Sequence, residues 1–260
     1  MDRRPGIEYA DLTDIGCQRE QNEDSSGYWE PNSEDGLERR GRLAVIADGM
    51  GGYEGGQEAS RIAVQTICDS YANTPVLDHQ VALLSSIREA HERIQKYALE
   101  HPEFFGMGTT CTAICIVREQ LHYAHVGDSR LYLVRKGVIS QLTQDHSYVA
   151  RLVLLGAIRP EEAETHPQRH ILTSALGVGQ QPLVDTPAAP LTLESGDVLL
   201  LCTDGLWGIV SDQELRDFVN AGSASQACQE LVRLAKERGG PDNITVQVLR
   251  IAENGAGGAS

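Results

Sequence analysis

Hydrophobic residues recur with two different periods along this chain. In residues 59–67 and 83–98 they return at intervals of three and four positions, which is typical of amphipathic helices that bury one face. The same spacing predicts a third helix over residues 225–238, where Gly239 and Gly240 supply a stop signal. Two consecutive helices are therefore expected in the first half of the chain, and another near its end.

The remaining apolar segments are short and rich in β-branched residues, as strands are. They cover residues 7–13, 42–47, 109–117, 120–126, 131–135, 197–202 and 243–251. Very short connections join the three segments between residues 109 and 135, which predicts an antiparallel meander. The polar segment 30–42 is expected to form a long exposed hairpin. Antiparallel strands with helices gathered in blocks indicate an α+β fold.

Length and composition narrow the class of protein. With 260 residues, 41% of them hydrophobic and 23% charged, the chain has the composition of a globular protein. We expect a single domain over residues 1–252 and a flexible Gly/Ala tail over residues 253–260. The sequence contains no apolar stretch that could cross a bilayer or serve as a secretory signal, so we expect a cytoplasmic protein that does not associate with membranes. Six scattered cysteines are expected to be reduced residues of the core.

The net charge of −15 limits the partners that the chain can bind. A negative surface repels the phosphate backbone, so nucleic acid is not expected as a partner. A phosphorylated small group would also be repelled unless the binding site carried cations of its own. Bound metal ions would supply them.

Four aspartates share one local design, because each lies beside glycine or asparagine next to an apolar strand. They are Asp48, Asp128, Asp204 and Asp242. Any one of them alone is more typical of a turn than of a ligand. Together, strands such as 43–47 and 199–202 would deliver acids to the same rim of a sheet, where the carboxylates repel one another unless a cation lies between them. Oxygen ligands of this kind favour Mg²⁺ or Mn²⁺ over zinc.

Two further groups of residues have candidate roles: the glycines after Asp48 and the segment that begins at Arg19. Gly49 has no side chain, so its carbonyl could bind the same ion. The glycine-rich run that follows Gly49 could instead cradle a phosphate, but it lacks the lysine and hydroxyl pair of such loops. Arg19, followed by Glu23 and Asp24, is either part of a solvated polar turn or a guanidinium fork for a phosphoryl group. In the second interpretation, Glu23 and Asp24 hold metal-bound water.

Seven segments, in this order, resemble the type 2C, metal-dependent Ser/Thr protein phosphatases, in particular the compact bacterial members. The match extends over nearly the whole chain. The segments are Arg19-x-x-Asn22-Glu23-Asp24, Asp48-Gly49-Met50-Gly51-Gly52, Gly108-Thr109-Thr110, Val126-Gly127-Asp128-Ser129-Arg130, Leu142-Thr143-Gln144-Asp145-His146-Ser147, Leu201-Cys202-Thr203-Asp204-Gly205-Leu206 and Gly240-Pro241-Asp242-Asn243-Ile244-Thr245.

The resemblance implies a β-sandwich of two antiparallel sheets flanked by helices in four layers, αββα, with a metal cluster at one end. It implies that Asp48 bridges two metals and that the Gly49 carbonyl, Asp204 and Asp242 complete this site. Asp128 and Asp204 would hold a third, weaker ion. Arg19 would bind the substrate phosphate, and Asn243 would support the site together with Glu23 and Asp24.

Two positions depart from the family pattern, since relatives place a histidine where this chain has Met50 or Tyr53. Metal-bound water and the Tyr53 phenol are the alternative proton donors for the leaving group. Residues 145–177 resemble the family's flap, which tunes substrate choice, and a short helix is expected at residues 161–164. His146, His166 and His170 in this flap are interpreted as packing or substrate-contact residues in preference to zinc ligands.

The expected activity is hydrolysis of phosphoserine and phosphothreonine monoesters by water bridging two divalent metals, without a covalent intermediate. Catalysis would depend on Arg19, Asp48 and Asp204. The substrates would be phosphoproteins, with a cognate Ser/Thr kinase as partner, and the chain is expected to be a monomer. The alternatives are a pseudophosphatase that serves as a binding module and a sandwich that uses ions only for structure. Retention of the four aspartates and Arg19 argues against both.

Overall fold

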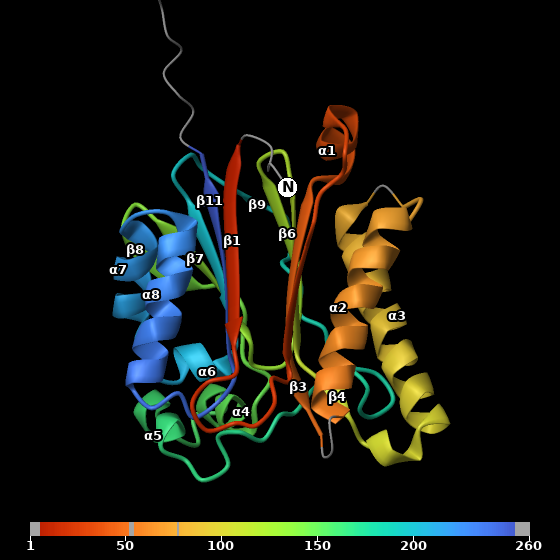
Figure 1. The fold of residues 1–260 in the computed structure, drawn as a ribbon, viewed down its shortest axis with the longest axis vertical. Coiled ribbons are helices and arrows are strands. Elements are labelled where there is room, and N and C mark those ends of the chain that lie inside the picture. Colours follow the sequence, from red (N-terminus) through yellow and green to blue (C-terminus); the bar gives the residue numbers. More distant parts are fainter. Residues whose placement is uncertain (1–5, 52–54, 77, 253–260) are drawn as a thin grey trace, which may run out of the picture.

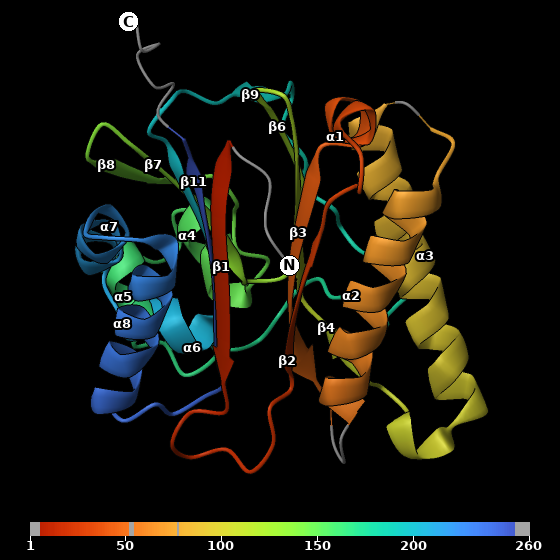
Figure 2. The ribbon, with the colours of Figure 1, turned by 45° about the horizontal axis from the view of Figure 1, so that its top comes forward.

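Two antiparallel sheets lie face to face in the centre of the molecule, and helices cover the outer face of each (Figures 1 and 2). This computed structural model describes residues 6–51, 55–76 and 78–252. One sheet has the strand order β1 (Ile7–Asp14), β11 (Ile244–Ile251), β10 (Val198–Cys202), β7 (Arg130–Arg135), β8 (Val138–Gln141). The other has the order β2 (Asp24–Trp29), β3 (Arg42–Met50), β5 (Cys111–Val117), β6 (Gln120–Val126), β9 (Leu191–Thr192), with β4 (Gly108–Thr109) beside β3.

The helices form the two outer layers and the connections between strands. Helices α2 (Gly55–Asn73) and α3 (His79–Glu100) pack on the sheet that contains β3, whereas α7 (Asp212–Asn220) and α8 (Ala224–Glu237) pack on the sheet that contains β10. The short elements are α1 (Glu34–Arg40), the 3-10 helix η1 (Pro102–Phe104), α4 (Tyr148–Leu154), α5 (Pro160–Glu164) and α6 (Asp204–Trp207). The predicted α+β sandwich with flanking helices is confirmed.

Each interface between layers has its own apolar core. Between the sheets, Ile46, Ile114 and Leu199 are fully buried. Beneath α2 and α3, Ile67 and Leu83 belong to a second cluster, and a third cluster lies beneath α7 and α8. Because both faces of strands β3 and β10 are covered, these strands are continuously apolar and do not alternate with polar residues.

The predicted meander over residues 109–135 is correct for β5 and β6, which pair antiparallel, and wrong for β7. Strand β7 lies in the opposite sheet between β10 and β8. The connection begins at Gly127, which has φ +106°, a conformation that glycine adopts without strain. A Cβ atom at Gly127 would lie 2.6 Å from Thr110, so the turn also requires close packing. The chain therefore crosses between sheets where the sequence suggests a hairpin.

The expected exposed hairpin over residues 30–42 contains helix α1 instead. Ser33 caps its first turn by accepting a hydrogen bond from the Gly36 amide, and acidic residues precede basic ones along its length. Gly41, with φ +67°, ends the helix. These capping residues outweigh the polar character that suggested a loop.

Local sequence signals explain the predicted helices well. Helix α8 begins with a capping box in which Ser223 and Gln226 exchange hydrogen bonds, and α5 confirms the short helix expected near residues 161–164. All six cysteines are free, as predicted, but Cys17 is exposed and Cys68 is partly buried. Cys17 therefore does not belong to the core.

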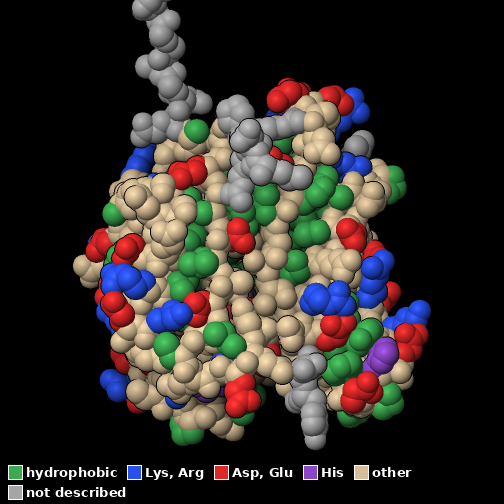
Figure 3. All heavy atoms as spheres, in the orientation of Figure 1, with side chains coloured by type: hydrophobic (Ala, Val, Ile, Leu, Met, Phe, Trp, Pro, Cys, Tyr) green, Lys and Arg blue, Asp and Glu red, His purple; other side chains and the backbone are tan. Residues whose placement is uncertain are grey.

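Acidic and basic side chains stand beside one another on the two helical flanks of the face in Figure 3. Ion pairs account for part of this pattern: Arg233 contacts Glu230 on α8, and Arg61 contacts Glu58 on α2. Within the described residues, no helix combines the length and apolar character required to span a bilayer.

Candidate metal centre

The four predicted aspartates lie at one end of the sandwich, where strand β3 ends and helix α6 begins; α6 is near the lower end in Figure 1. Strand β3 carries Asp48 near its end, and β10 leads through Thr203 to Asp204, the first residue of α6. Asp242 immediately precedes β11, and Asp128 lies in the turn between β6 and β7. Strand pairing within each sheet and the stacking of the two sheets thus bring together residues that are far apart in the sequence.

Glycines allow this convergence because the backbone segments approach too closely for a side chain. A Cβ atom at Gly205 would lie 1.9 Å from the Asn243 carbonyl oxygen, and one at Gly49 would lie 2.0 Å from the Gly56 carbonyl oxygen. The first contact holds the start of α6 against the start of β11, and so holds Asp204 near Asp242. The glycines beside Asp48 and Asp204 are therefore packing requirements.

Asp48 is the centre of the acidic cluster. Its backbone amide donates to Thr110 Oγ1 at 2.9 Å, and its backbone carbonyl accepts from the Thr110 amide at 2.8 Å, so its position is well fixed. Burial raises the pKa of the Asp48 carboxyl well above its ordinary value, and the charges of Asp24, Asp204, Asp128 and Asp242 raise it further. The carboxylate at this position is unstable without a nearby cation.

Asp24 faces Asp48 across the β2–β3 pair and is buried. Its Oδ2 accepts hydrogen bonds from Thr203 Oγ1 at 2.9 Å and Thr245 Oγ1 at 2.6 Å. Its Oδ1 is buried and has no hydrogen-bond partner in the described part of the chain. Burial raises the Asp24 pKa to about 7, against the opposing effect of the two hydroxyl groups.

Asp128 and Asp204 form the part of the cluster near the flap. Burial raises the pKa of the Asp128 carboxyl well above its usual range, and Asp204 raises it further. The Asp204 pKa is raised by burial and by Asp242, while a hydrogen bond with Asp48 lowers it. His170 Nδ1 lies 4.0 Å from Asp204 Oδ2, so one flap histidine reaches the rim of the site.

Arg19 is a cation at the edge of this cluster. Its Nη2 contacts Asp242 Oδ2 at 2.6 Å, while its side chain remains 48% exposed and thus open to a ligand. The hydrogen bond with Asp242 and the charges of Asp242, Glu23 and Asp204 raise the Arg19 pKa against an opposing desolvation effect. Arg19 therefore lies beside the acids, as the phosphate-binding interpretation requires.

Asn243 organises the loop that carries Arg19 and Glu23. Its side-chain NH₂ donates to the carbonyls of Ile15 and Gln21, both at 2.9 Å, and its Oδ1 accepts from the Glu23 amide at 2.8 Å. The Glu23 carbonyl in turn accepts a hydrogen bond from the Gly49 amide at 3.1 Å. The pKa of Glu23 is raised by burial. Asn243 and Glu23 thus connect the acidic strands to the arginine loop.

The donor set fits a hard divalent cation. Carboxyl groups gather in a region where burial and mutual repulsion raise several of their pKa values, and the buried Asp24 Oδ1 has no hydrogen-bond partner among the described residues. Within the described ranges, no three acidic, histidine or cysteine side chains already stand as ligands around one point. Asp242 forms an ion pair with Arg19, and the other carboxylates repel one another. A bound cation would therefore have to draw these carboxylates together.

The predicted flap histidines do not act as a group. His146 is buried: it accepts a hydrogen bond from the Gly127 amide on Nδ1, and its Nε2 lies 3.1 Å from Asp185 Oδ2. His166 lies near the Tyr148 ring, and His170 lies near Asp204. Packing at His146 agrees with the preferred interpretation. Of the two departures from the family pattern, Met50 pairs with Gly108, whereas Tyr53 lies outside the described residues.

Several supporting residues were not singled out from the sequence. Thr203 and Thr245 hold Asp24, although both belong to segments that carried the resemblance. Trp207 and Arg130 lie beside Asp128 and Asp204. The sequence signal for Thr203 and Thr245 was a hydroxyl residue one or three positions from a candidate acid, which is too common a feature to indicate a role alone.

Comparisons with known proteins identify the class to which this sandwich belongs. The family described as protein phosphatase 2C matches residues 20–246. Protein phosphatase PhpP of Streptococcus pneumoniae is 38% identical over 96% of this chain and 100% of its own length. The serine/threonine phosphatase stp of Listeria welshimeri is 37% identical over 91% of this chain and 93% of its own.

A solved structure extends the likeness to three dimensions. The crystal structure of the catalytic domain of the phosphatase PstP in complex with two manganese ions has a TM-score of 0.81 and 33% identity, covering 95% of this chain and 99% of that one. The chain therefore belongs to the protein phosphatase 2C family.

Proposed function

We propose that this chain hydrolyses phosphoserine and phosphothreonine monoesters in proteins. The observation that carries the proposal is the gathering of Asp48, Asp128, Asp204 and Asp242 beside Arg19 at one end of the sandwich. The family and its Ser/Thr phosphatase relatives support the same activity.

Two divalent ions would be held by Asp48, the Gly49 carbonyl, Asp204 and Asp242, and a weaker one by Asp128 with Asp204. When bound, Mn²⁺ or Mg²⁺ lowers the pKa of water and neutralises phosphoryl charge. The bound ions would balance the negative charge of the acid cluster. The raised carboxyl pKa values reflect the same excess of negative charge. Mn²⁺ in the PstP structure supports this choice of ions.

Arg19 binds and orients the substrate phosphate. A guanidinium offers paired N–H donors that match phosphate oxygens, and the Arg19 side chain is nearly half exposed at the mouth of the site. On substrate binding, Arg19 divides its hydrogen bonds between Asp242 and the phosphate. Asn243 and Glu23 keep the Arg19 loop in register with the acidic strands.

The finer assignments belong to the same proposal. Phosphoproteins made by a Ser/Thr kinase are the proposed substrates, and the chain is proposed to act as a cytoplasmic monomer in bacterial signalling. A pseudophosphatase that binds phosphoproteins without turnover is the alternative. The preserved acids and Arg19 favour the enzyme, because a binding module has no need of an acid cluster that destabilises the metal-free fold.

The test is hydrolysis of a small aryl phosphate and of a phosphothreonine peptide, with and without Mn²⁺. We expect turnover that requires the metal and that is lost in Asp204→Asn. The matched control Asp212→Asn changes an acid of α7 and should retain activity. Failure of a folded, Mn²⁺-loaded sample to turn over either substrate would reject the enzyme and favour the binding module.

A further inference from the structure

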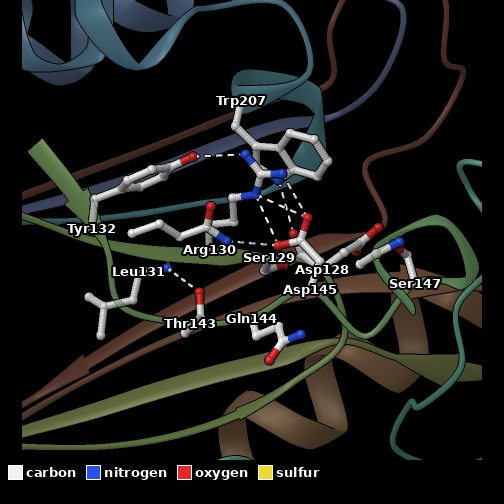
Figure 4. Close-up of polar contacts among 12 residues, drawn as sticks. Asp128, Ser129, Arg130, Leu131, Tyr132, Thr143, Gln144, Asp145, Ser147 and Trp207 are labelled. Atoms are coloured by element: carbon white, nitrogen blue, oxygen red, sulfur yellow. Dashed lines mark hydrogen bonds and ion pairs between the residues drawn. The ribbon is translucent and has the colours of Figure 1, made fainter. Parts of the chain in front are cut away.

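A buried arginine fork lies beside the acid cluster (Figure 4). Arg130 opens strand β7, and its Nε and Nη2 donate to the Asp145 carboxylate at 3.0 and 2.7 Å. Its Nη1 donates to the Tyr132 hydroxyl at 3.0 Å. The two charged side chains are 19% and 11% exposed, so the pair is largely shielded from water. A bidentate pair in this environment holds one geometry.

Trp207 completes the arrangement on the other face of the guanidinium. The Arg130 Cζ lies 3.5 Å from the centre of the Trp207 ring, a stacking distance for a cation on an aromatic face. The indole Nε1 donates to the Asp128 backbone carbonyl at 2.9 Å. Trp207 therefore contacts both the arginine and the turn that carries Asp128, as Figure 4 shows.

These contacts join three segments: helix α6, the start of strand β7 and the base of the flap. Trp207 ends the four-residue helix α6, whose first residue is Asp204. Arg130 lies two residues after Asp128 and pairs across the sheet with Cys202, two residues before Asp204. Asp145 leads directly into the flap. The stack of Trp207 on Arg130 thus connects the turn that carries Asp128 with the helix that begins at Asp204.

The base of the flap is fastened to the same turn. The His146 amide donates to the Gly127 carbonyl at 2.7 Å, and the Gly127 amide donates to His146 Nδ1 at 3.2 Å. Gln141 Nε2 donates to Asp145 Oδ1 at 2.9 Å. Asp145 therefore cannot shift without moving the Asp128 turn, so the fork is anchored from both sides.

We propose that Arg130, Asp145 and Trp207 are positioning residues that set the separation of the Asp128 and Asp204 carboxylates. By doing so, they determine the affinity of the weaker divalent ion expected between these two acids. This role rests on the metal sites of the proposed function. None of the three side chains is a ligand in this proposal. Their effect passes through the Asp128 backbone and helix α6. Of the groups proposed to hold the tight ions, only Asp204 lies on α6, whereas Asp48, the Gly49 carbonyl and Asp242 depend on other contacts.

Strand β7 carries a matched control at its other end. Arg135 forms the same kind of fork with Asp197, with Nε–Oδ1 and Nη2–Oδ2 distances of 2.9 and 2.6 Å. That pair lies at the end of the sandwich remote from the acid cluster. Arg135→Lys therefore removes an equivalent fork without touching the Asp128 turn, whereas Arg130→Lys removes the fork beside it.

The experiment is a calorimetric titration of the metal-free protein with Mn²⁺, which separates tight from weak binding without any substrate. In Arg130→Lys, we expect the weak dissociation constant to rise about tenfold or more, because lysine can neither form the fork nor stack as a plane. Trp207→Phe keeps a ring but loses the hydrogen bond to Asp128, so a rise of about fivefold is expected. In both variants the tight constants should change by less than about threefold. Arg135→Lys should change neither class.

A fluorescence readout tests the geometry independently. The chain has two tryptophans, so Trp29→Phe leaves Trp207 as the reporter. Occupation of the weak site by Mn²⁺ should change the Trp207 emission at the concentration that the titration assigns to weak binding. Urea unfolding of each metal-free variant measures folding separately.

Selective loss of weak binding in Arg130→Lys and Trp207→Phe, with the tight ions retained, supports the proposal. Three results overturn it: binding of only two Mn²⁺ by the parent protein, unchanged weak binding in both variants, or parallel loss of tight and weak binding. If the parent protein binds three ions yet hydrolyses no phosphoester, the proposed function is wrong. The positioning role is then still tested by the titration of the variants.

Discussion

The two ends of the sandwich differ in how their acidic side chains are paired. Where strands β3 and β10 begin, the acids form ion pairs with arginine. Where these strands end, the acids outnumber the nearby cations. Arg42 opens β3 and binds Glu30 at 3.1 Å, and Asp197 precedes β10 and binds Arg135 at 2.6 Å. Further along those strands lie Asp48 and Asp204, whose pKa values are raised by burial and by neighbouring acids.

The difference separates charges that the fold pairs from charges that it leaves without enough cations. A buried acid with an arginine partner stabilises the fold relative to the same acid left alone. Buried acids that raise one another's pKa destabilise the metal-free fold, as expected for acids at a functional site. The two ends should therefore respond in opposite ways to the same substitution.

Replacing aspartate by asparagine at each end should produce the largest contrast. Asp48→Asn should lower Mn²⁺-dependent hydrolysis by about 10³-fold or more, because it removes a central charge of the site. It should also stabilise the metal-free protein, since it removes a buried, repelled charge. Asp197→Asn should retain turnover but lower the free energy of unfolding by about 2 kcal/mol through loss of charge-assisted hydrogen bonds with Arg135. Steady-state kinetics and urea unfolding measure both, and loss of stability in metal-free Asp48→Asn would contradict the comparison.

Removing an arginine should distinguish substrate binding from structure. Arg19→Ala should raise the substrate KM by about tenfold to a hundredfold, since charged hydrogen bonds to phosphate are lost, with a smaller change in Mn²⁺ affinity. The exposed Arg39, which pairs with Asp35 at the other end, is the control, and Arg39→Ala should leave KM unchanged. Collapse of Mn²⁺ binding with an unaltered KM would instead make Arg19 a support for Asp242.

The acid end should make the metal-free protein less stable as the pH rises. The folded state keeps the Asp24 carboxyl protonated up to about pH 7, whereas the unfolded chain releases that proton near its ordinary pKa, so stability present at lower pH is lost on raising the pH through 7. Between about pH 6.5 and about pH 8, Asp24 alone should account for about 1 kcal/mol.

The pH range of this prediction avoids the more acidic range in which buried histidines also affect stability. Burial lowers the pKa of His125 to about 4, so at more acidic pH this neutral histidine would oppose the trend. Thermal unfolding of the metal-free protein with and without Asp24→Asn measures the effect. A pH dependence that the substitution leaves unchanged would assign it to other groups.

The smallest effect is expected from a cap at the paired end. Ser33→Ala removes the side chain that accepts from the Gly36 amide and should lower the free energy of unfolding by about 1 kcal/mol or less. Because α1 connects β2 to β3 far from the acids, kcat and KM for the aryl phosphate should not change. A shift in either constant would show that the two ends are coupled.

The principal helices, most strands, the α+β class and the family can be read from the sequence alone, which also predicts four aspartates and Arg19 as site residues. These depend on local signals: apolar period, β propensity, caps, and short segments in a fixed order. It did not show that β7 leaves the predicted meander, since a turn of glycine and aspartate is compatible with a hairpin as well as with a crossing between sheets.

The contacts among the groups around the acids depend on the tertiary structure. Thr203 and Thr245 meet on Asp24, and Trp207 meets Arg130, through strand pairings between residues that are distant in the sequence. A local pattern contains no information on such contacts, because they depend on how two sheets stack and where the chain crosses between them. The carboxyl pKa values have the same origin, since burial and the convergence of Asp24, Asp48 and Asp204 exist only in the folded chain.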